Sequence, residues 1–173
     1  MEKFVVVPHE PNWQTLFSTE REKISLALGL NLLAIHHIGS TAILEIYAKP
    51  VIDILAVASD LEHLDACNPA MTQLSYEVKG EFGIVGRRYY GKNINGVRAF
   101  QLHAFEHGSP QIVRHLAFRD YLNSHPEDAA AYSELKRKLI LEHDGDPEKY
   151  MDGKDDFIRE IDRRASLASV LKL

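Results

Sequence analysis

The sequence has one cysteine among 173 residues, so no disulfide can form within the chain. Cys67 lies among apolar neighbours in a predicted helix, the usual setting of a small core residue. A single unpaired cysteine is typical of the reducing cytoplasm, where we expect this protein to act. No apolar run approaches the roughly 20 residues that cross a bilayer, and residues 1–8 lack the long apolar core of a signal peptide. A membrane partner is therefore not expected.

The motifs of several enzyme classes are also missing. There is no His-Glu-x-x-His or Cys-x-x-Cys pattern and no glycine-rich loop ending in Lys-Ser/Thr, which excludes the common zinc sites and a P-loop. The Gly-x-Ser-x-Gly elbow of a hydrolase is absent. With a net charge of −5, the chain has no global attraction for nucleic acid, and a polyanion site would have to be a local patch.

What is present is an ordinary globular composition, with 45% hydrophobic and 26% charged residues. No Pro/Gly/Ser-rich linker divides the chain, so we predict a single domain over residues 1–173. Within it, residues 1–108 form an α/β sheet core and residues 109–173 a helical tail.

Hydrophobic spacing and turn residues predict the elements. The order of helices and strands indicates an α+β fold on a mixed sheet. We expect an extended arm or edge strand at 4–7, helix 12–28, strand 32–38, a turn at 39–41, a short helix 42–47 capped by Ser40, strand 51–57, a helix from Asp60 disturbed by Pro69, strands at 76–78, 87–90 and 97–105, and helices 112–122, 129–140 and 155–171.

The stretch from His36 to Val57 holds the most informative polar groups. A Gly-Ser turn at Gly39 and Ser40 is followed by Asp53 on an otherwise apolar strand. An unpaired carboxylate there is costly, so Asp53 is either in an ion pair, for instance with Lys49, or has a functional role. Such a turn beside an acid is one way to hold a phosphate next to a metal ion.

Two later strands contribute further candidates. Alternation places Gln101 and His103 on one face of strand 97–105, opposite an apolar face, which indicates either a structural histidine or a pocket. Arg87 and Arg88 point to opposite faces, so at most one reaches a common site, where it would grip phosphate. The alternative is an ordinary edge-strand charge.

The helical tail carries basic residues on its first two helices. We interpret these as a solvated face paired with acids; RNA binding through Arg119 is the alternative, and the net charge disfavours it. They are Arg114, His115, Arg119, Lys136, Arg137 and Lys138.

Several segments together resemble the GrpB family over most of the chain. They are Val6 to Trp13, His37 to Ala42, Ala48 to Ile54, Glu81 to Tyr90, Leu102-His103 and His115 to Leu122. The resemblance implies membership of the nucleotidyltransferase superfamily. It also implies a nucleotidyltransferase-like mixed β-sheet with helices packed on it and a helical C-terminal region.

The resemblance assigns roles residue by residue. Gly39 and Ser40 fall on the superfamily's phosphate-holding turn, and Asp53 on the first acid of its Asp-x-Asp pair. Active members have a second acid two residues on, so that two carboxylates bind the metal ions. That position is Leu55 here, and the region of the third acid carries Gln101 and His103.

These observations predict a protein that binds a nucleotide or another phosphorylated small molecule, with metal-dependent nucleotidyl or phosphoryl transfer as its reaction. The alternative is a catalytically inactive binding module for a ligand or protein partner, which Leu55 favours. A divalent ion, Mg²⁺ or Mn²⁺, would bind Asp53 together with His103 or Glu81; Glu106 is a further acid that folding could bring to Asp53. Asp53 and His103 are the catalytic candidates. The ligand-binding candidates are His37, Gly39, Ser40, Thr41, Lys49, Arg87, Arg88 and Arg119.

Overall fold

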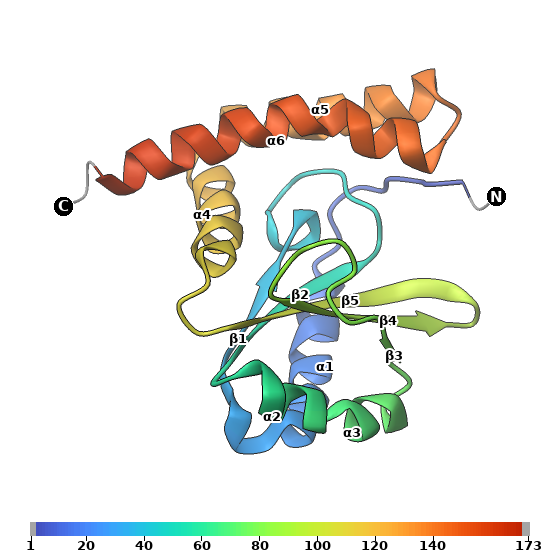
Figure 1. The fold of residues 1–173 in the computed structure, drawn as a ribbon. Coiled ribbons are helices and arrows are strands. Elements are labelled where there is room, and N and C mark those ends of the chain that lie inside the picture. The colour runs from blue at the N-terminus through green and yellow to red at the C-terminus, as the bar shows by residue number, and fades with distance from the viewer. Residues whose placement is uncertain (1–2, 171–173) are drawn as a thin grey trace.

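A five-stranded mixed sheet forms the centre of the computed structural model, which describes residues 3–170 (Figure 1). The strand order is β1-β2-β5-β4-β3; β2 and β5 are parallel and the other neighbours antiparallel. The α+β prediction is therefore confirmed. The strands are β1 (Leu32–Ile38), β2 (Ile52–Ala58), β3 (Glu77–Val78), β4 (Arg87–Ile94) and β5 (Val97–Glu106).

Helices cover the sheet in two groups (Figure 1). The first group, α1 (Asn12–Leu28), α2 (Leu61–Ala66) and α3 (Asn68–Gln73), lies at the lower side of the sheet in that view. The second group, α4 (Pro110–Ser124), α5 (Pro126–Glu142) and α6 (Pro147–Val170), forms a helical layer above it. Proline stands at the start of all three helices of this layer, where its missing N–H has no intrahelical partner to lose.

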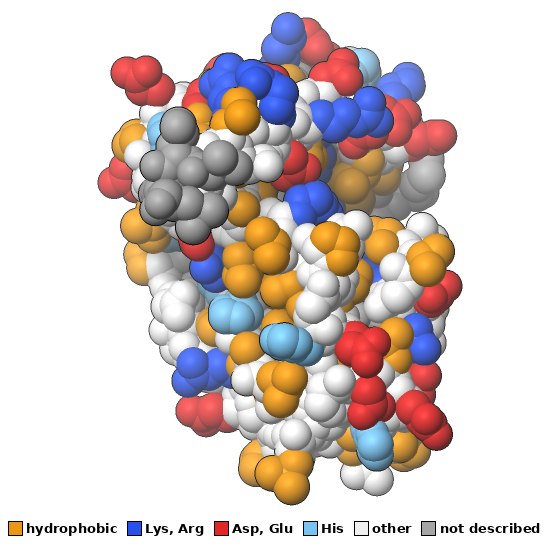
Figure 2. All heavy atoms as spheres, turned by 60° about the vertical axis from the view of Figure 1, so that its left-hand side comes forward, with side chains coloured by type: hydrophobic (Ala, Val, Ile, Leu, Met, Phe, Trp, Pro, Cys, Tyr) orange, Lys and Arg blue, Asp and Glu red, His pale blue; other side chains and the backbone are white. Residues whose placement is uncertain are grey.

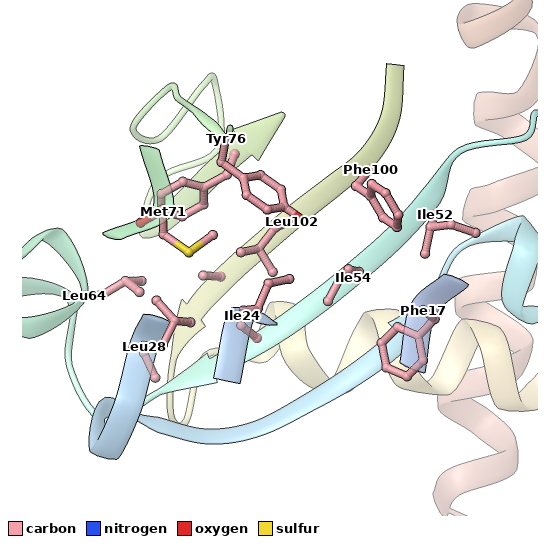
Figure 3. Packing of buried hydrophobic residues seen from close by; sticks show 14 of the residues in the cluster. Phe17, Ile24, Leu28, Ile52, Ile54, Leu64, Met71, Tyr76, Phe100 and Leu102 are labelled. Atoms are coloured by element: carbon pink, nitrogen blue, oxygen red, sulfur yellow. The ribbon is translucent and has the colours of Figure 1, made fainter. Parts of the chain in front are cut away.

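The largest hydrophobic core lies between α1, α2, α3 and one face of the sheet (Figure 3). On α1 the buried residues recur every three or four positions, all of them apolar except Glu20, which confirms the predicted amphipathic helix and Trp13 as a core anchor. The faces of β2 and β5 that pack against these helices are also apolar, as period-two alternation predicted. The labelled residues are Phe17, Ile24, Leu28, Ile52, Ile54, Leu64, Met71, Tyr76, Phe100 and Leu102.

Two smaller clusters join the helical layer to the sheet. Ile38, Leu55 and Phe105 form one of them, against partly buried side chains of α4. Leu55 is fully buried there, so the position of the superfamily's second acid is part of a hydrophobic core. Ile43 and Ile46 enter the other cluster, among α4, α5 and α6.

The prediction of a short helix at 42–47 is wrong. Only a three-residue 3-10 turn, Ser40–Ala42, is present, without a side-chain cap, and Glu45 has a positive φ of 62°. Contacts with the helical layer replace the helical hydrogen bonds. The N–H of Leu44 donates to Asn123 Oδ1 (3.0 Å), and that of Tyr47 donates to Ser133 Oγ (2.8 Å).

Other boundaries differ in extent. The strand predicted at 87–90 continues to Ile94, and the final helix starts at Pro147 rather than Asp155; Leu171, its predicted last residue, lies outside the described residues. In the N-terminal arm, Val7 forms an isolated antiparallel β-bridge with Ala48. Among residues 3–170, no helix combines the length and apolar character that a bilayer crossing requires.

Candidate functional site

A cavity of about 280 Å³ lies between the sheet and the helical layer. Its lining combines segments that are far apart in sequence: the turn after β1, the start of β2, the middle of β5, and all three helices of the layer. The polar and charged lining residues are Ser40, Thr41, Lys49, Asp53, Gln101, His103, Arg114, His115, Tyr132, Tyr150 and Lys154.

The turn after β1 brings Asp53 and the backbone of Gly39 close together. Gly39 has φ 71° and ψ −172°, a conformation that is strained for residues with a Cβ. A Cβ on Gly39 would lie 2.6 Å from Asp53 Oδ2, so the carboxylate packs against the space that glycine leaves empty. The Gly-Ser turn and the acid on the next strand are thus one unit, as the sequence indicated.

His103 links Asp53 to Arg87. Asp53 Oδ1 lies 3.4 Å from His103 Nε2, and His103 Nδ1 lies 3.4 Å from Arg87 Nη1. Because the guanidinium only donates, the consistent tautomer accepts at Nδ1 and donates from Nε2 to the carboxylate. Parallel pairing of β2 with β5, in which Asp53 faces Gln101 and Leu55 faces His103, places these groups together. Both ring nitrogens of His103 are therefore engaged.

Two lysines of the helical layer share a pattern. Lys136 follows Tyr132 by four residues, and Lys154 follows Tyr150 by four. Both ammonium groups lie 4.4 Å from the ring centroid of the preceding tyrosine, in cation–π contact. Lys136 is 1% exposed and Lys154 8%.

The buried lysines lack opposite charge. Lys136 Nζ has no hydrogen-bond partner among the described residues. Burial, and next the charge of Lys154, lower the pKa of Lys136 to about 7. Burial, and next Lys49, lower the pKa of Lys154 to about 8, although Asp53 opposes this. Burial also lowers the pKa of Lys49, whose Nζ lies 3.8 Å from the Phe4 ring centroid. On this side of the cavity, the positive charge of the lysines is therefore not balanced by carboxylates of the described residues.

The other helical residues of the cavity have partners. Arg114 pairs with Asp162 at 3.3 Å. Burial lowers the pKa of His115 to about 3, helped by the charge of Arg114, so this histidine is neutral near pH 7.

Thr41 and His37 support the turn rather than offering free groups. Thr41 lines the cavity, but its hydroxyl donates to Val51 O (3.4 Å) and lies 2.9 Å from His37 Nε2. The His37 ring stacks on Phe17 at 4.9 Å, and burial lowers its pKa to about 4. His37 itself lines a different hollow, beside Arg119.

Three of the predicted charged residues lie outside the cavity lining. Arg88 forms a two-point ion pair with Asp65. Arg119 donates to the backbone oxygen of His37 (2.9 Å). Arg87 is buried, and reaches the cavity only through His103.

Neither Glu81 nor Glu106 supplies the missing second acid. The Glu81 carboxylate accepts from the N–H of Gly86 (2.8 Å), and Glu106 is exposed at the end of β5, paired with Ala58. Within the described residues, no three His, Cys, Asp or Glu side chains are arranged to hold a metal ion.

The basic residues of the tail separate into two kinds. The interpretation of a solvated face holds for Arg137, which pairs with Glu134, and for Lys138, which pairs with Glu142. It is wrong for Lys136, which is buried. Figure 2 shows acidic and basic side chains intermixed on the helical layer at the top of that view, with apolar side chains gathered below.

Sequence reasoning missed the aromatic and cationic wall of the helical layer. Tyr132, Lys136, Tyr150 and Lys154 were not among the predicted site residues. The repeated Tyr-x-x-x-Lys spacing was the available signal, since it places ring and ammonium on one helical face.

Known proteins similar to this chain have related sequences and folds. The model of the family described as GrpB protein matches residues 3–164. UPF0157 protein YqkA of Bacillus subtilis is 39% identical over 94% of this chain, which spans only 47% of YqkA. The crystal structure of conserved protein GrpB from Enterococcus faecalis matches with a TM-score of 0.89 and 37% identity, covering 93% of this chain and 96% of that one.

A more distant likeness concerns the fold alone. The Cid1 poly(U) polymerase matches with a TM-score of 0.53 at 11% identity, over 80% of this chain and 43% of that one. The fold is accordingly nucleotidyltransferase-like, as predicted. With the family model covering almost all of its length, the chain belongs to the GrpB protein family.

Proposed function

We propose that this protein binds a nucleotide or another phosphorylated small molecule in the cavity between sheet and helical layer. The observation that carries the proposal is the pair of lysines in the cavity lining, half-buried Lys49 and buried Lys154, with buried Lys136 close to Lys154 but outside the lining. Within the described part of the chain, none of them has a carboxylate partner within 4.0 Å. Burying cations without counter-charge costs free energy, and an anionic ligand would offset that cost.

The dimensions and remaining groups are consistent with such a ligand. A cavity of about 280 Å³ is near the small end of ligand pockets, which suits a phosphate-bearing part of a nucleotide. Ser40 also lines the cavity, and Tyr132 and Tyr150 supply aromatic walls.

A metal ion would fit only in part. One carboxylate, Asp53, together with phosphate oxygens of the ligand is a known way to hold a single Mg²⁺ or Mn²⁺. A second ion lacks its ligand, because Leu55 is buried in an apolar cluster. The geometry therefore supports binding better than two-metal nucleotidyl transfer.

His103 fits a positioning role in this proposal. A general base needs a free lone pair facing its substrate, and both ring nitrogens already have partners. His103 would orient Asp53, and catalytic roles for the two residues stay predictions.

The test is titration calorimetry with ATP and with pyrophosphate, each with and without Mg²⁺ or Mn²⁺. We expect binding of at least one probe, and about tenfold or greater weakening in Lys154→Met through loss of one charge-assisted contact. Lys149→Met, an exposed lysine of the same helix, is the matched control and should bind normally. Asp53→Asn should remove any dependence on the metal. Absence of binding by both probes in every metal condition refutes the proposal.

Turnover is a separate measurement. Incubation with ATP and metal should release no pyrophosphate above background. Release that disappears in Asp53→Asn would establish cleavage of ATP between its α- and β-phosphates, with water or another group as the acceptor of AMP, and would contradict a role in binding alone.

A further inference from the structure

A second cavity, of about 330 Å³, adjoins the first. The two share Lys49, Val51 and Gln101 as a common wall. The rest of the second cavity comes from the N-terminal arm, the loop before β4, and the β4–β5 hairpin, so it uses no residue of the helical layer.

Apolar and aromatic side chains form much of its lining. The rings of Phe82 and Tyr89 stack with centroids 5.0 Å apart and planes inclined by only 11°. Phe82 is 59% exposed, Val97 54% and Val5 56%, so these three side chains leave apolar surface uncovered around the opening. Tyr89 is buried at 7% exposure, so the pair offers a planar group the exposed ring of Phe82, held in place by the Tyr89 ring beneath it.

Arginine provides a specific polar anchor beside these rings. Arg98 Nη1 is buried and has no hydrogen-bond partner among the described residues, while Arg98 Nη2 lies 4.0 Å from Glu77 Oε2. The guanidinium occupies the space above Gly91, where a Cβ would lie 1.5 Å from Nη1. Glycine at this position of β4 therefore permits the placement of Arg98. The Arg98 side chain is 26% exposed, so the part of the guanidinium that is not buried against Gly91 can donate to an acceptor on a ligand.

Further cations surround the same cavity. Lys79 Nζ lies 5.0 Å from the Phe82 ring centroid and pairs with Glu77 at 3.3 Å. Lys49 and Lys3 complete the basic lining; Lys3 pairs with Asp144. Among the residues that the structure describes, the lining contains four basic side chains and no acidic one.

We propose that this second cavity binds a small molecule with a planar ring and an anionic group, a carboxylate or phosphate. The ring would pack on Phe82 and Tyr89, and the anionic group would accept from Arg98. The inference goes beyond the proposed function and does not depend on it, since it uses neither Ser40 nor Lys154. With both cavities filled, two ligands would meet at the shared wall of Lys49 and Gln101.

The probe is 1-naphthoate, with its uncharged analogue 1-naphthamide, followed by naphthalene fluorescence and by ligand-observed NMR on the full chain. We expect the anion to bind about tenfold or more tightly than the amide, the effect of one charge-assisted hydrogen bond. Arg98→Met should weaken 1-naphthoate by a similar factor. Arg163→Met, which removes an exposed arginine of α6, should not.

Phe82→Ser gives a second variant on the exposed ring, with Leu30→Ser as its control, since Leu30 is fully exposed outside the cavity. Phe82→Ser should weaken the binding of 1-naphthoate and of 1-naphthamide by a similar factor. Equal affinities for the two probes, or wild-type binding by both Arg98→Met and Phe82→Ser, would overturn the inference.

Pyrophosphate distinguishes this site from the phosphate cavity. We expect 1-naphthoate to bind equally well in saturating pyrophosphate and in Lys154→Met. Competition between pyrophosphate and 1-naphthoate for one site would overturn the inference of a separate cavity. Failure of both pyrophosphate and ATP to bind in every metal condition, with naphthoate binding retained, would refute the proposed function alone.

Discussion

Replacing Lys136 by methionine should stabilise the fold while weakening ligand binding. The ammonium group is fully buried, carries no hydrogen bond within the described residues, and has the charge of Lys154 nearby. Methionine keeps a flexible chain of similar length and removes the charge. The Tyr132 ring, 4.4 Å from Lys136 Nζ, provides an apolar surface for the new thioether.

The magnitude follows from the pKa of Lys136, which falls from 10.5 to about 7 on folding. A factor of ten in a protonation equilibrium is about 1.4 kcal/mol, so the buried charge costs at most about 5 kcal/mol. Below pH 7 the group is charged in both states and the cost is complete. Between pH 7 and 10.5 the unfolded chain holds the proton more tightly, so the stability of the wild type rises with pH.

Scanning calorimetry at pH 6 and pH 9 measures this effect. At pH 6 we expect Lys136→Met to raise the melting temperature by about 5 °C or more, since 1 kcal/mol moves a domain of this size by about 2–4 °C. The gain should be smaller at pH 9. Lys138→Met, which replaces an exposed lysine two residues along the same helix, is the control and should change little. Pyrophosphate affinity should fall in Lys136→Met. A lower melting temperature at pH 6 would refute the reasoning, because it would mean that the buried ammonium is net stabilising.

Three further predictions concern groups around the sheet. Gly39→Ala should lower the free energy of unfolding by about 2 kcal/mol or more, measured in urea, because its Cβ would meet Asp53; an unchanged midpoint would contradict the packing described. Glu20→Gln should cost about 3–5 kcal/mol by leaving Lys92, 2.7 Å away, partly buried without its counter-charge; a cost below 1 kcal/mol, on the order of a surface pair, would argue otherwise. The lowered pKa of His37, about 4 against 6.5, means that the unfolded chain binds the proton first, so stability is complete above pH 6.5 and is lost as pH falls to about 4. His37→Asn should flatten this part of the stability profile, and a profile as steep as that of the wild type would count against it.

Local patterns predicted most of the elements because the forces that form them are themselves local. The five buried positions of α1 recur at helical spacing, and β5 alternates between buried and partly buried positions from Phe100 to Ala104. Alternation placed His103 on the polar face of its strand, and the resemblance to the GrpB family gave it a role beside Asp53. The parallel register of β2 and β5 brings the two side chains within 3.4 Å.

The segment 42–47 shows where this reasoning fails. Its composition permits a helix, but Ile43 and Ile46 are buried by α4, α5 and α6, and Asn123 and Ser133 satisfy its N–H groups. Such partners lie about 80 residues away, so no local window contains them. Tertiary contacts therefore decided the conformation.

The lysines of the helical layer were missed for a related reason. Lys136 is followed directly by Arg137 and Lys138, and the three together have the composition of a solvated surface. Only the packing of α5 on α6 and the sheet separates Lys136, which is buried, from its two exposed neighbours. Arg88 is the opposite case, a residue that was predicted to bind the ligand but lies outside the cavity. Its ion pair with Asp65, from a distant part of the sequence, holds it there.

The placement of the cavity at the boundary between the sheet and the helical layer has a mechanical consequence. The two parts are joined there by hydrogen bonds such as Asn123 Nδ2 to Ala42 O and Arg119 Nη1 to His37 O, and by the clusters around Ile43 and Leu55. A ligand that contacts Ser40 on one side and Lys154 on the other would act as an additional tie across this boundary. Its binding energy would then resist separation of the helical layer from the sheet, and hydrogen exchange in α4, α5 and α6 should slow together when the ligand is added.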